Sequence, residues 1–216
     1  MKKPIVVAFS GGCFSGKTST IKALKDILSS KGYNVVILDE LIRNAIPNNL
    51  SIDAIRKYPF KYFALEKKII REKILQEDYI KYNNAVDNNT IILVDRALTD
   101  SLFYYENFVK KDELKLELQK EFYDFHDYLI KKTHEHFENI YDLIIQFKPL
   151  SSEKAKTNKD KFRPLSIHLS NKYEYECIKR LNNYFVNSVS NCKMIEIDLS
   201  SSSGNNCIEK IIENII

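Results

Sequence analysis

The chain has 216 residues, of which 44% are apolar and 29% charged, with a formal net charge of +4. This is the composition of an ordinary globular protein with a sizeable core, and no segment reaches the ~20 apolar residues of a membrane-spanning helix. The first residues lead directly into an apolar run, so we expect no signal peptide. Four cysteines without metal-ligand spacing indicate reduced thiols in a cytoplasmic protein.

The first predicted element is a buried strand at 5–9, an apolar run rich in β-branched residues. The run FSGGCFSGKT at 9–18 follows it and fits the phosphate-loop pattern G-x-x-x-x-G-K-[ST]. An amphipathic helix is then predicted over 17–30. A strand, a glycine-rich loop and a helix N-terminus together form a nest of backbone N–H groups for phosphate. The predicted nucleotide-binding residues are Gly11, Gly12, Cys13, Phe14, Ser15, Gly16, Lys17, Thr18 and Ser19.

Two side chains of this loop carry the chemistry that the pattern implies. Lys17 is expected to reach the terminal phosphates, and the Thr18 hydroxyl is expected to hold Mg²⁺. ATP and Mg²⁺ are therefore the expected cofactors.

The remaining elements alternate between strands and helices, which predicts a parallel sheet covered by helices on both faces. We expect strands at 34–38, 90–94, 142–147 and 193–197, and helices near 60–83, 99–109, 113–137, 171–187 and 205–216. The predicted fold class is an α/β three-layer sandwich of the P-loop NTPase type, with a mostly parallel five-stranded sheet in one domain over 1–216. Ligands of such folds bind at the carboxyl ends of the strands.

The strand predicted at 34–38 ends in Asp39, Glu40 and, three residues further, Arg43. A carboxylate at this place can accept the proton of an attacking hydroxyl, and an arginine on the same helical face can bind an acceptor phosphate or orient it. Glu40 is the first candidate for the base and Asp39 the second. An ordinary ion pair at a helix start is the alternative interpretation.

The strand predicted at 90–94 ends in Asp95 and Arg96. An aspartate that closes the strand beside a phosphate loop is expected to contact Mg²⁺, directly or through water. Arg96 stands where hydrolytic ATPases often place a catalytic glutamate. Because an arginine cannot act as a base but can stabilise a phosphoryl group, this favours transfer to an acceptor over hydrolysis.

Two further segments are candidates for substrate contacts. The polar stretch 151–170 follows a strand end and carries several lysines and Arg163, so it is interpreted as a lid, with a solvated loop as the alternative. Tyr62 and Phe63 belong to an aromatic-rich helix start and are candidates for stacking on a nucleoside base, although most aromatics here are expected in the core. The four histidines, at 126, 134, 136 and 168, are expected on the surface.

These motifs together resemble the P-loop kinases of nucleosides and nucleotides, including nicotinamide riboside kinase-like domains and, more distantly, thymidylate and deoxynucleoside kinases. The resemblance implies Lys17 on the phosphates, Thr18 and Asp95 at Mg²⁺, Glu40 near the acceptor hydroxyl and Arg96 near the transferring phosphate. It also implies that Arg163 acts as a lid arginine. Ala97 and Ser101 depart from the thymidylate kinase pattern, which argues against thymidylate as the substrate.

The sequence therefore predicts a phosphotransferase with catalytic residues Lys17, Glu40, Arg96 and Arg163, acting on a nucleoside, a nucleotide or a similar small hydroxylated acceptor. Two alternatives stay open: a kinase acting on a hydroxyl carried on nucleic acid, and a P-loop ATPase or nucleotide-sensing regulator. The sequence also leaves a homodimer open.

Overall fold

Five parallel strands form the centre of the described structure, in the order β2-β3-β1-β4-β5. The computed structural model describes residues 3–13, 15–46, 51–82, 89–150, 171–200 and 204–216. The strands are β1 (Ile5–Ser10), β2 (Asn34–Leu38), β3 (Thr90–Asp95), β4 (Leu143–Phe147) and β5 (Lys193–Ile197). All residues of β3 and β4 are buried, as expected of parallel strands covered on both faces.

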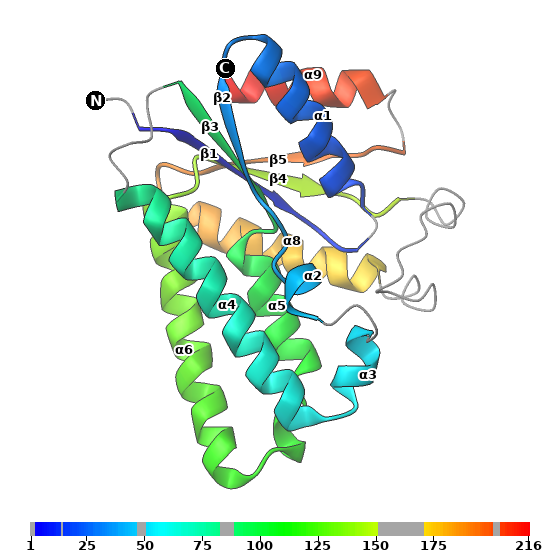
Figure 1. The fold of residues 1–216 in the computed structure, drawn as a ribbon, viewed down its shortest axis with the longest axis vertical. Helices are drawn as coiled ribbons and strands as arrows, with labels where there is room; N and C mark the ends of the chain where they lie inside the picture. The colour runs from blue at the N-terminus through cyan, green and yellow to red at the C-terminus, as the bar shows by residue number, and fades with distance from the viewer. Residues whose placement is uncertain (1–2, 14, 47–50, 83–88, 151–170, 201–203) are drawn as a thin grey trace.

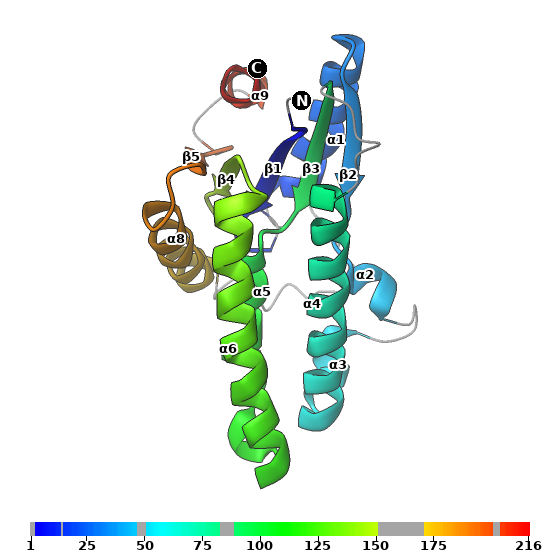
Figure 2. The same cartoon turned by 90° about the vertical axis from the view of Figure 1, so that its left-hand side faces the viewer.

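The helices form a layer on each face of this sheet (Figures 1 and 2). One layer holds α1 (Lys17–Ser30) and α9 (Gly204–Ile215). The other holds α4 (Pro59–Tyr82), α5 (Leu98–Phe108), α6 (Leu116–Asn139) and α8 (Asn171–Asn187). The long helices α4 and α6 extend well beyond the sheet, so this second layer also builds a helical projection below it.

Each layer packs on the sheet through its own apolar cluster. The α1 and α9 side is joined to the sheet by side chains such as Leu24, Leu28 and Ile211, all 0% exposed. The opposite cluster includes Ile70, Tyr105 and Leu129 from three different helices. The two clusters together confirm the predicted three-layer α/β sandwich of the P-loop NTPase type.

The predicted long elements agree with the structure to within a few residues at their ends. Short helices α2 (Ile42–Ala45) and α3 (Ile52–Arg56) and the 3-10 turn η1 (Lys111–Glu113) were not predicted, because four or five residues show no periodicity. Segment 110–138 corresponds to η1 and most of α6, which packs against α5, α4 and α8. The predicted lid at 151–170 lies outside the described residues.

The prediction of surface histidines is wrong for His136. This side chain is completely buried, and its Nδ1 lies 2.8 Å from the Lys132 carbonyl oxygen. His136 follows Thr133 by three residues and Leu129 by seven, so it shares the face of α6 that packs inward. Attention to this spacing rather than to residue type would have placed it correctly. His134 is exposed.

In the part of the chain that the structure describes, no helix is long and apolar enough to cross a membrane. The four cysteines carry free thiols, three of them buried.

Candidate active site

The phosphate loop leaves the end of β1 and enters α1, and two of its glycines are required by the backbone. Gly11 has φ of +134° and Gly16 has φ of +91°, a region that other L-residues rarely adopt. A Cβ on Gly11 would also lie 2.8 Å from the Phe147 carbonyl oxygen. The glycine run therefore brings the loop backbone close to β4, and loops of this kind can offer further backbone N–H groups to an anion.

Lys17 is folded back onto this loop. Its Nζ donates to the carbonyl oxygens of Gly11 at 2.6 Å and Gly12 at 2.7 Å, and lies 3.2 Å from the Ser15 hydroxyl. Burial, with the nearby positive charge of Arg96, lowers the pKa of this ammonium. A cation held only by carbonyls and a hydroxyl is well suited to exchange these partners for phosphate oxygens.

Thr18 and Asp95 form the second polar pair at the start of α1. The Thr18 hydroxyl donates to Asp95 Oδ2 at 2.8 Å. The other carboxylate oxygen, Oδ1, is buried and has no hydrogen-bond partner among the described residues. A hydroxyl oxygen and an unpaired carboxylate oxygen, side by side at a phosphate loop, fit the oxygen-rich coordination that Mg²⁺ requires.

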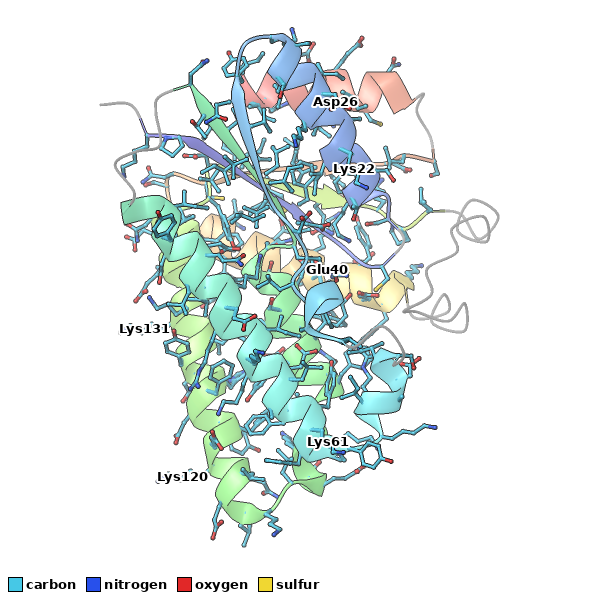
Figure 3. The ribbon with its side chains drawn as sticks, in the orientation of Figure 1. Lys22, Asp26, Glu40, Lys61, Lys120 and Lys131 are labelled. Atoms are coloured by element: carbon cyan, nitrogen blue, oxygen red, sulfur yellow. The ribbon has the colours of Figure 1, made fainter. Side chains whose placement is uncertain are left out.

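Arg96 and Glu40 join the carboxyl ends of β3 and β2. Arg96 Nε lies 2.5 Å from Glu40 Oε1, and both side chains are more than 90% buried. Burial opposes the charged form, but Glu40 and Tyr104 raise the pKa of the guanidinium well above its usual value. Figure 3 shows Glu40 where β2 reaches the helical layer. The pair therefore holds two opposite charges in fixed positions at the edge of the sheet where ligands are expected.

Arg96 also has an unusual backbone. Its φ is +81°, whereas every other residue with positive φ in the described chain is a glycine. Its N–H donates to the Phe9 carbonyl oxygen at 2.9 Å, which holds the residue against β1. The left-handed conformation directs the guanidinium to Glu40 and, at 3.0 Å, to the Tyr104 hydroxyl. Strain of this kind is typical of functional positions.

A buried polar network, which was not predicted from the sequence, supports the loop from below. Asp100 accepts hydrogen bonds from the Ser10 hydroxyl at 2.6 Å and the Gly11 N–H at 3.0 Å. Asn182 of α8 donates to Ser10 Oγ at 2.7 Å and to Gln146 Oε1 at 2.6 Å. Burial raises the pKa of Asp100, while Arg96 and Lys17 oppose this shift. The loop is thus anchored to α5, α8 and β4 at once.

A cavity lies beside the Arg96–Glu40 pair, between the sheet edge and the helical layer. Its walls come from the loop, the ends of β2 and β3, and helices α3, α4, α5 and α8. Several of its polar side chains were not predicted as site residues: Arg56, Glu66, Lys73, Gln76, Glu77, Tyr104 and Glu174. These residues are separated by up to 118 positions in the sequence. Only for those in α4 could the helical spacing have indicated that they share a face.

Glu174 closes the cavity on the α8 side. It accepts a hydrogen bond from the Tyr104 hydroxyl, and it lies so close to the loop that a Cβ on Gly12 would be 3.2 Å from its carboxylate. The side chain is 3% exposed. Glu174 therefore fixes the position of the phosphate loop relative to α5 and α8.

The structure brings most of the predicted residues together. Cys13, Asp39, Glu40, Asp95 and Arg96 line one cavity, and Lys17, Thr18 and Ser15 adjoin it through the loop. Ser19 lies on the exposed side of α1.

Other predicted site residues are placed elsewhere. Tyr62 and Phe63 are 1% and 2% exposed in the core and are not among the cavity-lining residues. The Phe63 ring packs against Tyr105 of α5 and Phe122 of α6, and the Arg56 guanidinium lies over the Tyr62 ring. The side chain of Arg43 and the residues Phe14 and Arg163 lie outside the described part of the chain.

Comparisons with known proteins agree with this geometry. Residues 6–184 match the family model described as an AAA domain. Because this match covers most of the sequence, the chain belongs to that family of P-loop domains. None of the curated proteins compared with the chain matches it.

Two solved structures of the same relative show the same fold. A deoxyadenosine kinase from M. mycoides, with the products dCMP and a flexible dCDP bound, has a TM-score of 0.63 and 17% identity, covering 97% of each chain. Its structure with bound dATP has a TM-score of 0.56 and 17% identity, covering 97% of this chain and 98% of that one. The resemblance to P-loop nucleoside kinases is therefore confirmed at the level of the fold.

Proposed function

We propose that the protein is a cytoplasmic, ATP-dependent phosphotransferase whose acceptor is a nucleoside, a nucleotide or a similar small hydroxylated molecule. One observation carries the proposal: the buried Glu40–Arg96 pair and the Thr18–Asp95 pair line or adjoin the same cavity at the edge of the sheet. Such a cavity can hold an acceptor hydroxyl next to a phosphate bound at the loop.

The donor half of this site is the phosphate loop. Its N–H groups would bind the phosphates of ATP, and Lys17 would leave the carbonyls of Gly11 and Gly12 to contact the terminal phosphates. Thr18 and Asp95 would hold Mg²⁺, which supplies charge stabilisation on the phosphates when bound. The buried, unpaired Asp95 Oδ1 supports this role.

The acceptor half is the Glu40–Arg96 pair. Glu40 would accept the proton of the attacking hydroxyl as the new P–O bond forms. Arg96 would orient Glu40 and stabilise negative charge on the transferring phosphoryl group. The 2.5 Å contact between them supports a unit in which Glu40 would face the attacking hydroxyl and Arg96 the phosphoryl group, because neither side chain can move without losing its partner.

The relatives support a nucleotide-type acceptor. The deoxyadenosine kinase with the same fold is described with dCMP, dCDP and dATP bound. Burial of the cavity walls, including Ile69 and the aromatic ring of Tyr104, suits a small flat molecule better than a polymer.

The proposal is tested by measuring ATP-dependent phosphorylation of a panel of nucleosides and nucleotides. The Lys17→Ala change should reduce kcat/KM about 100- to 1,000-fold, because it removes one cation from the transferring phosphate. Glu40→Gln should reduce kcat by a similar factor by removing the base. Lys22→Ala is the matched control, because Lys22 lies on the outer face of the same helix α1 (Figure 3).

Two outcomes would contradict the proposal. In one, the Lys17→Ala variant transfers phosphate as fast as the Lys22→Ala control. In the other, the wild-type protein turns over ATP at the same rate with and without every acceptor, which would favour an ATPase or a regulator.

A further inference from the structure

Helix α4 contributes a charged wall to the cavity. Five of its residues line the cavity, at spacings that place them along one helical stripe: Glu66, Ile69, Lys73, Gln76 and Glu77. Opposite charges at Lys73 and Glu77 stand one helical turn apart. The ion pair that they form does not belong to the phosphate loop or to the Glu40–Arg96 unit.

This ion pair is buried, and its two charged atoms lie close together without the geometry of a hydrogen bond. Lys73 Nζ lies 2.6 Å from Glu77 Oε1, and the two side chains are 11% and 0% exposed. The Tyr141 hydroxyl donates to Glu77 Oε2 at 2.6 Å and accepts from the Leu98 N–H at 3.2 Å. Since Leu98 is two residues from Arg96, this chain of contacts ties the α4 wall to the loop that carries Arg96.

Glu77 is surrounded on its other side as well. His136 Nε2 lies 3.5 Å from Glu77 Oε2, and burial lowers the pKa of His136. Glu77 is thus fixed by contacts from α4, from α6 and from Tyr141, which lies two residues before β4. Lys73 differs, because Glu77 is its only charged partner among the described residues and the ammonium carries three N–H donors.

A buried ion pair is weak evidence for stability, because apolar residues of similar volume often stabilise as well or better. Because this pair lies in a cavity wall, it can instead select among ligands. A largely buried ammonium with spare donors in a cavity wall favours a ligand that places an acceptor atom opposite it, and it disfavours any ligand that presents another N–H donor there.

We propose that Lys73 determines which acceptor is used, by donating a hydrogen bond to a ring carbonyl oxygen of a flat heterocycle, with Glu77 as its positioning residue. The preferred acceptor is an oxo-substituted nucleoside, and its amino-substituted counterpart is rejected because two donors would face each other. This inference rests on the proposed function, since it names the acceptor of the same site.

The test uses two matched pairs of nucleosides: deoxyinosine with deoxyadenosine, and deoxyuridine with deoxycytidine. Each pair differs in an oxo or an amino group at one ring position. For the wild type we expect the oxo member of at least one pair to have a kcat/KM and a Kd at least about 10-fold better. Lys73→Met should reduce this ratio to near one, mainly through KM, while Lys73→Arg should restore part of it.

Two further variants separate specificity from folding. Lys68→Met is the matched control, because Lys68 and Glu72 form the same type of pair, 3.8 Å apart, on an exposed face of α4. Its ratio should equal that of the wild type. The double variant Lys73→Met/Glu77→Gln leaves no unpaired buried charge, and it should also lose the preference while remaining folded by circular dichroism.

Three outcomes would overturn the inference: no preference in the wild type, a preference for the amino member in both pairs, or an equal loss for both members in Lys73→Met. Kd is measured by calorimetry without ATP, so it is independent of phosphotransfer. Wild-type protein that binds the oxo nucleosides but phosphorylates nothing would contradict the proposed function alone. Absence of binding to all four nucleosides would overturn the role of Lys73 alone, provided that another acceptor is phosphorylated.

Discussion

The two helical layers of this molecule differ in what they bury. The layer of α1 and α9 meets the sheet through a cluster that is almost wholly apolar. The opposite layer contains buried ionisable side chains on four helices, among them Glu77, Asp100, His136 and Glu174. Both layers support the same sheet. In α1 and α9 the buried charged residue is Lys17 at the phosphate loop, whereas each helix of the opposite layer carries a buried ionisable group that must be balanced by specific partners.

The difference shows which helical layer gives up stability by burying ionisable side chains. Buried charges stabilise a protein less than apolar side chains of the same size, so a layer that keeps several of them is expected to do so for a ligand. In this molecule Glu77 and Glu174 line the candidate cavity, and Asp100 is bonded to the start of the phosphate loop. The α1 and α9 layer supplies the phosphate loop at its edge and otherwise acts as a support.

The largest expected effect comes from removing the charge that anchors the loop. Asp100→Ala leaves the Gly11 N–H and the Ser10 hydroxyl without their partner and should destabilise the protein by about 3–5 kcal/mol. Phosphotransfer should fall as well, because the loop loses its support. Asp26→Ala, on the exposed face of α1 (Figure 3), is the control, with a change within about 0.5 kcal/mol in urea unfolding. Equal stability of the two variants would refute the anchoring role.

A substitution that creates a void in the α1 and α9 layer should lower the stability of the protein without changing phosphotransfer. Leu24→Ala removes a completely buried side chain between α1 and the sheet and should cost about 3 kcal/mol. Because Leu24 belongs to the apolar cluster and does not line the candidate cavity, kcat/KM per folded molecule should stay within about two-fold of the wild type. A large loss of kcat/KM in folded protein would show that packing of the α1 and α9 layer also controls phosphotransfer.

His136 should make the charged layer sensitive to mild acid. Burial lowers its pKa, opposed by Glu77 and Asp78, so the unfolded chain binds a proton near pH 6.5 before the folded protein does. Stability is therefore complete above about pH 6.5 and falls as the pH drops towards the folded pKa, by at most about 1.4 kcal/mol per unit. Urea unfolding of His136→Gln between pH 5 and 8 should lack this slope. His134→Gln, on the exposed face, should keep it.

The smallest effect is expected at a half-buried ion pair on the last strand, between Lys179 and Glu196. Burial opposes ionisation of Glu196, but hydrogen bonds from Lys179 and Tyr175 lower the pKa of Glu196 to about 2. The stability from this depressed pKa is present above about pH 4.5 and is lost as the pH falls towards 2. At neutral pH, Glu196→Gln should therefore cost less than about 1 kcal/mol. A larger loss in thermal unfolding would show that surface charges also matter for the fold.

The sequence predicted best what is encoded locally. The strand at 5–9, the glycine run and the helix at 17–30 are adjacent in the chain, so their geometry could be predicted from residue type and spacing. The carboxylates at strand ends were also predictable, because parallel topology places Glu40 and Asp95 at the same edge.

The rest depended on contacts between distant segments. Lys73, Glu77 and Glu174 reach the cavity through the packing of α4 and α8, which no local pattern describes. Tyr62 and Phe63 were equally compatible with a base-stacking site and with the core, and packing of α4 against α5 and α6 placed them in the core. His136 was misplaced because residue type was given more weight than helical register.

The left-handed backbone at Arg96 has a consequence for how such sequences vary. Every other described residue with positive φ is a glycine, so glycine would relax this turn, although it would leave Glu40 without its partner. A chain selected for stability alone could accept that exchange by also replacing Glu40 with an apolar side chain. If Arg96 has the proposed role, distant members of the family that transfer phosphate should keep an arginine after the aspartate of this strand, and members with a glycine there and no facing carboxylate should lack this activity.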